Sequence, residues 1–341
     1  MTTRPTMRMV AQASGVSLKT VSRVVNGEAS VSPATAAAVT ATIQRLGFIP
    51  NDLARSLRQG HTSSTLGLIT EDISNPFYSQ VARGVEEVAH QHGFMLISGS
   101  SEEQPGREQE LVQALVRRRV DALIIIPARG NHAYLHEELG EGTPAVFVDR
   151  PAIGYAADTI LLDNRGGARE AVAHLIRHGH RRIGLISGFE DVYTGAERSA
   201  GYAEALRAAG LPSEKALMRV NQHTVSGAAA AAAELLALPE PPTALFTLNN
   251  LLTVGALKTL WERRAQTALV GFDDFELADL LPVPVTVVHH DPAELGRQAA
   301  RLVFDRLNQG SLAPRSVVLP VQLIPRGSGE RPPTSSLEKG L

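Results

Sequence analysis

The feature that most constrains this fold is the alternation of short apolar runs with helical segments from Leu66 to about residue 309. The runs LGLIT, FMLIS and DALIIIP have the length and composition of buried strands. Between the first two runs, the apolar residues that share one helical face are Phe77, Val81, Val85, Val88 and Ala89. Strands that alternate with helices form parallel sheets covered by helices. The sequence therefore predicts an α/β body.

The expected strands are too many for one open sheet, and the pattern restarts near residue 163. We expect two similar parallel-sheet lobes, with ligands beyond the carboxyl ends of the strands. The loops expected at that position are residues 71–78, 187–198, 248–250 and 272–275.

Residues 1–60 differ from the body and contain three short helical patterns. Thr6, Ser17 and Ser32 each stand where the side chain can cap the start of one helix. Two helices joined by a tight Gly-containing turn are typical of the helix-turn-helix motif. The sequence therefore predicts an all-α head.

The expected domain boundary lies at about residue 61. Pro50 breaks the third helical pattern and Asn51 can cap one or two further turns, which we place at about 51–58 as a hinge helix. The two-lobed body is expected to span residues 61–330. Its first lobe comprises about 62–161 and 292–320, and its second about 162–290 and 321–328. The tail, 329–341, is rich in Gly, Pro and Ser and is expected to be disordered.

The second helix of the head, within GVSLKTVSRVVNG, has an apolar valine face and an opposite face without acids. The polar side chains are Ser17, Lys19, Thr20, Ser22, Arg23 and Asn26. The second helix of a helix-turn-helix lies in the DNA major groove. There Lys and Arg donate to guanine, and Ser, Thr and Asn bind phosphate or bases. The pattern alone fits a DNA-binding face and a plain solvated face equally well.

The charge distribution supports a separate function for the head. The chain has a net charge of −2. Residues 1–60 hold seven basic and two acidic residues, a net charge of +5, which leaves −7 for the rest. A basic head on an acidic body indicates that only the head meets a polyanion, although chance clustering would give the same count.

Several classes of protein are disfavoured. No run of about 18 apolar residues is present and the first residues lack the core of a signal peptide, so we expect a cytoplasmic, nucleoid-associated protein without membrane contact. There is no Cys, and no GxGxxG after the first strand, Walker, HExxH or GxSxG motif, so we expect neither an enzyme nor a cofactor. The cluster His289-His290-Asp291 lies where the chain should cross between lobes, and we expect no metal there.

Longer motifs point to a family. In the head they are VAQASGVSLKTVSRVVNG, VSPATAAAV and LGFIPNDLARSL, and in the body they include GLITEDISNPFYSQVARGVEE, VFVDRP, ERSAGYAEAL and VGFDD. On these motifs the chain resembles the lactose-repressor (LacI/GalR) family of bacterial transcription regulators over residues 6–326. The resemblance implies a helix-turn-helix head followed by a periplasmic-binding-protein-like body that holds a ligand between two lobes.

The resemblance also implies roles for residues of the head. Leu18, Lys19 and Arg23 match the family's base-reading positions. Leu57 matches a leucine wedged into the minor groove, and Ala54 lies beside it in the hinge helix. The residues that match backbone-binding positions are Thr6, Ser17, Thr20, Ser22 and Asn26.

In the body, the resemblance places an effector against Arg198, Asn249 and Asp273. A guanidinium with amide and carboxylate acceptors suits a ring of hydroxyls or a polar heterocycle. A salt bridge or helix cap is the alternative role for each. Further candidates at the cleft are Asp72, Phe77, Tyr78, Asp163 and Gln222. Arg129 would favour an acidic or phosphorylated ligand if it faced the pocket, and is otherwise a solvated loop residue.

We therefore expect a transcriptional regulator, a repressor by family resemblance, that binds a pseudo-palindromic operator as a homodimer. A small-molecule effector between the lobes, a carbohydrate first and a nucleoside or purine second, would control it. The sequence leaves induction and co-repression both open. The rivals are a ligand-binding transport protein without DNA function and an enzyme with a catalytic cleft between the lobes.

Overall fold

The computed structural model describes residues 5–26, 28, 30–48, 63–140, 142–309 and 313–333. The chain divides into two compact units, residues 1–63 and 64–341, close to the expected boundary at residue 61. The expected hinge helix at about 51–58, with Ala54 and Leu57, lies outside the described residues.

The first unit contains three helices that begin where the capping residues predict. They are α1 (Met7–Ser14), α2 (Leu18–Val25) and α3 (Pro33–Leu46). The side chains of Thr6, Ser17 and Ser32 accept hydrogen bonds from backbone N–H groups in the first turn of α1, α2 and α3, respectively. These bonds satisfy donors that a helix start otherwise leaves unpaired. The expected all-α head is confirmed.

A small core fixes α2 in this unit. Val21 of α2 is fully buried with Val10 of α1 and Val39 of α3, and Val16, Val24 and other apolar side chains pack around them. Because the valines occupy one side of α2, its polar side chains lie on the other.

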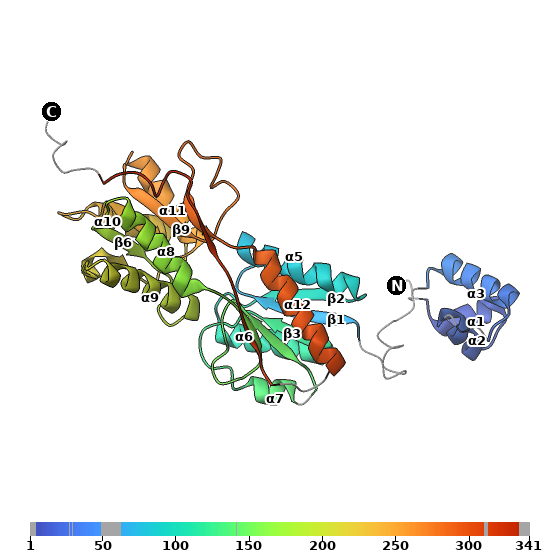
Figure 1. The fold of residues 1–341 in the computed structure, drawn as a ribbon. Coiled ribbons are helices and arrows are strands. Elements are labelled where there is room, and N and C mark those ends of the chain that lie inside the picture. Colours follow the sequence, from blue (N-terminus) through green and yellow to red (C-terminus); the bar gives the residue numbers. More distant parts are fainter. Residues whose placement is uncertain are drawn as a thin grey trace. The chain divides into compact units, whose positions relative to one another are not determined.

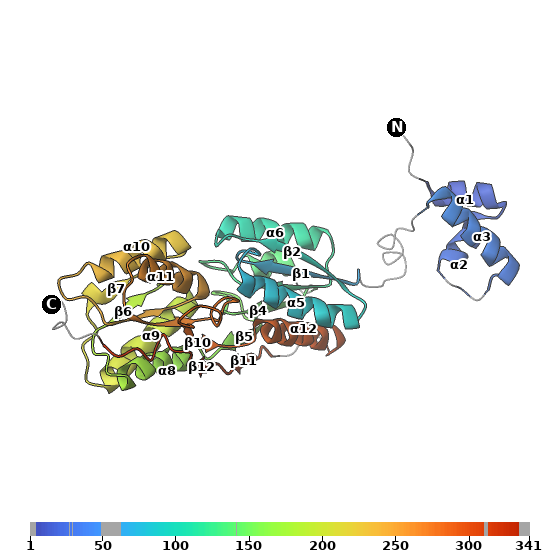
Figure 2. The same cartoon turned by 90° about the horizontal axis from the view of Figure 1, so that it is seen from above.

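The second unit contains two six-stranded sheets, which define its two lobes (Figures 1 and 2). The first sheet has the order β11-β5-β4-β3-β1-β2, and all its neighbouring pairs are parallel. Its strands are β1 (Thr65–Thr70), β2 (Met95–Ser100), β3 (Ala122–Ile125), β4 (Ala145–Val148), β5 (Asp158–Leu162) and β11 (Ser316–Leu319).

The second sheet has the order β12-β10-β9-β8-β6-β7, and only the β10–β12 pair is antiparallel. Its strands are β6 (Ile183–Ile186), β7 (Met218–Arg219), β8 (Ala244–Thr247), β9 (Ala268–Phe272), β10 (Thr286–His289) and β12 (Gln322–Ile324). The predicted α/β body with two parallel-strand lobes is confirmed.

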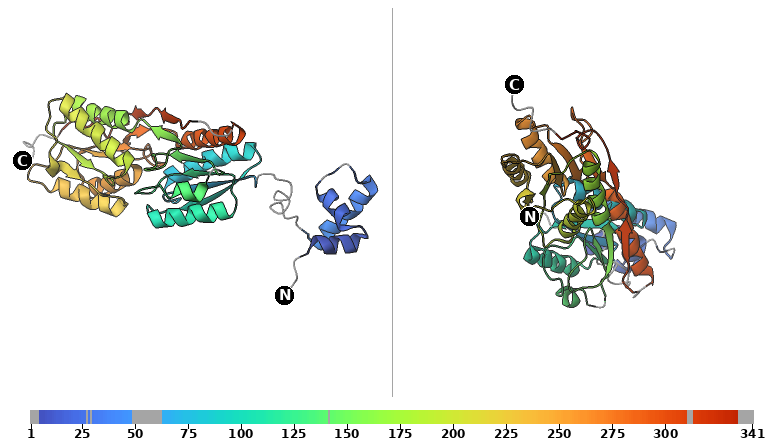
Figure 3. Two further views of the ribbon diagram at one scale, coloured as in Figure 1. Left: turned by 90° about the horizontal axis from the view of Figure 1, so that it is seen from below. Right: turned by 60° about the vertical axis from the view of Figure 1, so that its left-hand side comes forward.

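Helices cover both faces of each sheet. In the first lobe, α5 (Pro76–Gln91) and α12 (Pro292–Gln309) lie side by side on one face, although they are far apart in the sequence (Figure 3). The opposite face is covered by α6 (Pro105–Arg117) and α7 (Leu135–Leu139). The paired helices of the second lobe are α8 (Asn164–Arg177) with α9 (Tyr193–Ala208), and α10 (Val225–Leu236) with α11 (Asn250–Glu262).

The chain crosses between the lobes three times: from β5 to α8, from β10 to α12, and from β11 to β12. Each lobe is therefore built from discontinuous parts of the sequence. Multiple crossings place the carboxyl ends of both sheets next to the same junction, where a ligand can contact both lobes.

The expectation of a disordered tail from residue 329 is wrong for residues 329–333. Gly329 is buried, and the Glu330 carboxylate accepts a hydrogen bond from Thr286 Oγ1 at 2.8 Å and pairs with His174. His180 contacts the Arg331 carbonyl oxygen at 2.8 Å. Contacts with partners so distant in sequence are invisible to composition. Residues 334–341 lie outside the described part of the chain.

Within the residues that the structure describes, no helix is both long and apolar enough to cross a membrane.

Candidate functional site

The polar face of α2 is the candidate site of the first unit. Leu18 and Lys19 are exposed at the start of the helix, and α2 contains no acidic residue. The hydroxyls of Ser17 and Thr20 lie 2.9 Å apart at the N-cap. The helix start therefore presents unopposed backbone N–H groups, hydroxyls and a cation, which suits a phosphate-bearing partner.

The remaining residues expected at this face lie further along α2 or at the start of α1. Ser22, Arg23 and Asn26 are half-buried, and Arg23 lies 3.6 Å from the Glu28 carboxylate. Thr6 caps α1. Lys19 is thus an exposed cation of α2, whereas Arg23 has an acidic neighbour.

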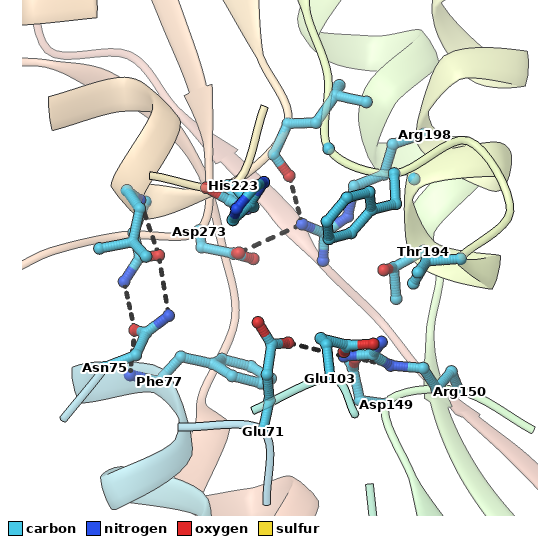
Figure 4. A pocket seen from close by; sticks show the side chains of 18 of the residues that line it. Glu71, Asn75, Phe77, Glu103, Asp149, Arg150, Thr194, Arg198, His223 and Asp273 are labelled. Carbon is cyan, nitrogen blue, oxygen red and sulfur yellow. Dashed lines mark hydrogen bonds and ion pairs between the residues drawn. The ribbon is translucent and has the colours of Figure 1, made fainter. Parts of the chain in front are cut away.

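The candidate site of the second unit is a pocket between its two lobes (Figure 4). It lies at the carboxyl ends of the strands, as expected, and encloses about 80 Å³. Of the residues expected at the cleft, those that line it are Phe77, Tyr78, Arg198, Gln222, Asn249 and Asp273.

Asp72 and Asp163 lie outside this lining. The Asp72 carboxylate accepts the Ser74 N–H at 2.8 Å, which closes a turn. Asp163 caps α8 by accepting the Gly166 N–H at 2.9 Å. Local backbone donors thus occupy both carboxylates, which is the ordinary role of Asp at such positions.

Other lining residues did not emerge from sequence reasoning: Glu71, Asn75, Glu103, Asp149, Arg150, Phe189, Thr194 and His223. Glu71, Glu103 and Asp149 follow β1, β2 and β4 closely. Their position after predicted strands was the available signal, but a position after a strand does not tell which way a side chain points.

Arg150 is the centre of a buried charge network in the first lobe. Its guanidinium donates to Glu71 at 3.0 Å, to Glu103 at 2.5 Å and to Asp149 at 3.2 Å. Tyr78 contributes a hydroxyl that donates to Glu71 and accepts from Arg150. One cation therefore serves three carboxylates.

The network divides the pKa values of its acids. Burial raises the pKa of Glu103 to about 7, with Arg150 opposing the rise and Glu71 adding to it. Burial also acts on Glu71, but Arg150 and hydrogen bonds overcome it and hold the pKa of Glu71 below its usual value. Because like charges in one site cannot all ionise at equal cost, Glu103 carries the penalty.

Arg198 and Asp273 form the corresponding buried pair in the second lobe. The Arg198 guanidinium donates to Asp273 Oδ2 at 3.1 Å, to Asn164 Oδ1 at 2.7 Å and to the Leu248 carbonyl at 2.5 Å. It also lies 3.7 Å from the centroid of the Phe272 ring. Burial raises the pKa of Asp273 despite the opposing charge of Arg198.

Two contacts join the lobes across the pocket. The side-chain amides of Asn75 and Asn250 pair, with 2.8 Å between Asn250 Nδ2 and Asn75 Oδ1. Near Phe189, Arg129 of the first lobe donates to Asp191 of the second at 2.7 and 2.9 Å. The Arg129 guanidinium also lies 4.3 Å from the Phe189 ring centroid, and Phe189 stacks on His223.

Arg129 itself does not line the pocket, and its charge is matched by Asp191. The suggestion that Arg129 favours an acidic ligand therefore loses its structural basis.

The histidines at the second crossing between lobes are separated by burial. His289 contacts Asp274, whereas His290 is buried without a hydrogen-bond partner, and burial followed by the charge of Arg198 lowers the pKa of His290 to about 3. No group of three or more metal-binding side chains occurs among the described residues.

Comparison with known proteins gives the class first. Residues 6–51 match the family described as "Bacterial regulatory proteins, lacI family", and residues 172–329 match the periplasmic binding protein-like domain. A lacI-type helix-turn-helix joined to a two-lobed ligand-binding domain defines a ligand-controlled class of transcription regulators.

Full-length relatives support the same class. The chain is 35% identical to the HTH-type transcriptional regulator CelR of Thermobifida fusca, covering 96% of this chain and 98% of CelR. It is 33% identical to the ribose operon repressor of Escherichia coli (strain K12), covering 95% of this chain and 99% of that protein.

Solved structures agree with these relatives. The CelR–cellobiose complex matches with a TM-score of 0.71 and 33% identity over 95% of this chain and all of that chain. The lac repressor dimer bound to operator and the anti-inducer ONPF matches with a TM-score of 0.83 and 25% identity over 96% of this chain and 99% of that chain. The chain belongs to the lacI family of bacterial regulatory proteins. It is a DNA-binding transcriptional repressor and not an enzyme.

Proposed function

We propose that this repressor binds a pseudo-palindromic operator as a homodimer, with α2 of each subunit in one major groove. The observation that carries the proposal is the exposed, acid-free start of α2, held in a helix-turn-helix unit by Val21. A helix of this kind reads base edges with its first residues. Because its ligand would be genomic DNA, the protein would act in the cytoplasm.

Within α2, Leu18, Lys19 and Arg23 would read bases, and Lys19 is fully available to do so. The groups proposed to bind the DNA backbone are Thr6, Ser17, Thr20, Ser22 and Asn26. The proposed roles of Ala54 and Leu57 in the minor groove concern residues outside the described part of the chain.

The pocket between the lobes is the proposed effector site. Its polar lining and its aromatic side chains Phe77, Tyr78 and Phe189 suit a polyhydroxyl ring, because rings can stack while hydroxyls bond to amides and carboxylates. A volume of about 80 Å³ holds roughly six water-sized groups, which favours one sugar ring over two. The effector would change operator affinity only by binding one lobe arrangement better than another.

Exposed apolar side chains in each lobe favour a homodimer. In the first lobe, Met95 and Ile97 are exposed on the edge strand β2. In the second lobe, Trp261 lines an apolar hollow with Leu281 and is 64% exposed, and Leu280 next to it is 73% exposed. Edge strands and apolar patches of this kind are normally covered by a partner, and the similar lac repressor structure is a dimer.

The test is selection of bound DNA from random duplexes by the full-length protein. We expect a palindrome with two equal half-sites, because a two-fold symmetric protein requires a symmetric site. Recovery of a single, non-repeated half-site would refute the dimeric mode of binding. Absence of any enriched sequence, with and without added sugars at low salt, would refute the operator proposal.

A further inference from the structure

The pocket between the lobes has an excess of negative charge. Its lining contains four carboxylates and two guanidinium groups, all of them in the described part of the chain: Glu71, Glu103, Asp149, Asp273, Arg150 and Arg198. The two cations are already engaged by these acids. The lining therefore offers no unmatched cation to an anionic ligand.

Each lobe also contributes one buried carboxylate oxygen without a hydrogen-bond partner. In the first lobe it is Glu103 Oε2, since Oε1 accepts from Arg150. In the second lobe it is Asp273 Oδ1, since Oδ2 accepts from Arg198. The nearest charged neighbour of Asp273 Oδ1 is His290 Nδ1 at 3.8 Å, which is too far for a hydrogen bond. Asp273 is 6% exposed, so water does not freely satisfy it.

A buried acceptor without a donor costs free energy until a donor arrives. The side chains of Glu103 and Asp273 lie on opposite sides of the pocket, one in each lobe (Figure 4). A ligand that donates hydrogen bonds on two sides would satisfy both oxygens and hold the lobes together. Phosphate and carboxylate groups are acceptors, and they would add charge to a site that already has too much.

We propose that Glu103, together with Asp273, selects the effector by charge, so that the pocket takes an uncharged or cationic polyhydroxyl compound and rejects its phosphorylated or carboxylated forms. This inference rests on the proposed effector site. It names Glu103 as a specificity-determining residue from the first lobe.

The backbone supports a dedicated role for Glu103. Glu102 and Glu103 both have left-handed φ angles, 54° and 57°, which are unfavourable for side chains other than Asn, Asp and Gly. The two neighbours then diverge: Glu102 is exposed and pairs with Arg107, whereas the Glu103 side chain is 12% exposed and faces Arg150. Glu102 is therefore a matched control in the same loop.

The experiment is titration calorimetry on the full-length protein with matched ligand pairs. The probes are D-ribose, D-glucose, D-galactose and adenosine, each beside its monophosphate ester. We expect at least one parent compound to bind, and its phosphate ester to bind at least about 100-fold more weakly, because like charges in a desolvated site are strongly repelled.

The variant Glu103→Gln keeps an oxygen for Arg150 but replaces the free acceptor with an amide donor. We expect it to weaken the parent compound about tenfold and to reduce the discrimination against the phosphate ester by a similar factor. Glu102→Gln should change neither, and thermal melts of both variants would establish that they are folded.

Equal binding of a parent compound and its ester, or unchanged discrimination in Glu103→Gln, would overturn the inference. Binding of none of the parent compounds would overturn it as well. In that last case, retained operator binding by the same preparation would leave the DNA-binding function standing and separate the two failures.

Discussion

Arg198 shows how one buried side chain can serve both stability and ligand binding. It pairs with Asp273, stacks on Phe272 and bonds to two further oxygens, yet it also lines the pocket. Removing one partner of a buried ion pair leaves the other uncompensated.

We therefore expect Arg198→Ala to lower the free energy of unfolding by about 3–5 kcal/mol and to abolish the effector response, with operator affinity retained in the folded fraction. Denaturant unfolding and operator binding with and without effector measure these effects. Arg165→Ala, which removes a half-exposed partner of Glu204, should cost less than about 1 kcal/mol. Equal losses in the two variants would contradict the role of Arg198.

Glu103 makes a prediction about pH. Its folded pKa of about 7 lies above the unfolded value of 4.5, so the folded state holds a proton that the unfolded state releases between these values. The contribution of Glu103 to stability is thus fully present below about pH 4.5 and lost as the pH rises through 7.

Relative to Glu103→Gln, the wild-type protein should therefore lose about 1–3 kcal/mol of stability between pH 5 and 8. Parallel denaturation curves over this range measure the difference, and taking it between two variants cancels other titrating groups. A constant difference across the range would show that Glu103 has an ordinary pKa.

At the scale of elements, loops of opposite lobes meet across the pocket. Arg129, after β3, pairs with Asp191, after β6, and covers Phe189. Both side chains of the pair are partly exposed, so the contact is modest in energy but sits where closure of the lobes is decided.

Arg129→Ala should shift the lobes toward an open arrangement by roughly 3–10-fold, since a partly exposed ion pair and a cation–π contact together contribute about 1 kcal/mol. Because the chain has no Cys, spin labels can be placed on Cys introduced at exposed Glu110 and Arg207, one in each lobe. Pulsed distance measurements report the populations. The swap Arg129→Asp with Asp191→Arg should restore closure, and distances unaffected by Arg129→Ala would rule out this contact as a determinant.

The exposed start of α2 makes a second prediction at this scale. Lys19→Ala should lower the slope of log affinity against log salt by about 0.9 if Lys19 contacts a phosphate. It should instead relax preference at one base pair by about 1–3 kcal/mol if Lys19 reads a guanine. Arg45→Ala, which removes an exposed cation from α3, is the control. Indistinguishable behaviour of the two variants in both measurements would exclude Lys19 from the interface.

At the scale of the whole molecule, function requires two chains. The exposed Trp261 and Leu280 would be buried in the proposed dimer. Trp261→Asp should raise the dimer dissociation constant at least about 30-fold, because a buried aromatic anchor contributes about 2 kcal/mol or more.

Analytical ultracentrifugation measures this change, and operator affinity should fall in parallel. Ile153→Asp places the same charge on a side chain that is 58% exposed in the other lobe. Similar dissociation by both variants, or by neither, would place the interface elsewhere.

Much of the fold follows from local sequence. The caps of α1, α2 and α3 and the apolar runs of the body fix most helix and strand positions, because capping and periodicity act within a few residues. The short elements β7, β11, β12 and α7 did not emerge from sequence reasoning. They span two to five residues, too few for a periodic pattern.

The candidate sites divide along the same line. The DNA-facing surface belongs to one helix, so its residues could be predicted together from spacing alone. The pocket joins loops that are far apart in sequence, and only tertiary structure decided that Glu103 and Arg150 enter it while Asp72 and Asp163 cap local backbone. By itself the sequence determined a helix-turn-helix head and a two-lobed α/β body. The orientation of each loop side chain depends on long-range packing and on the strand order, and no local pattern encodes either one.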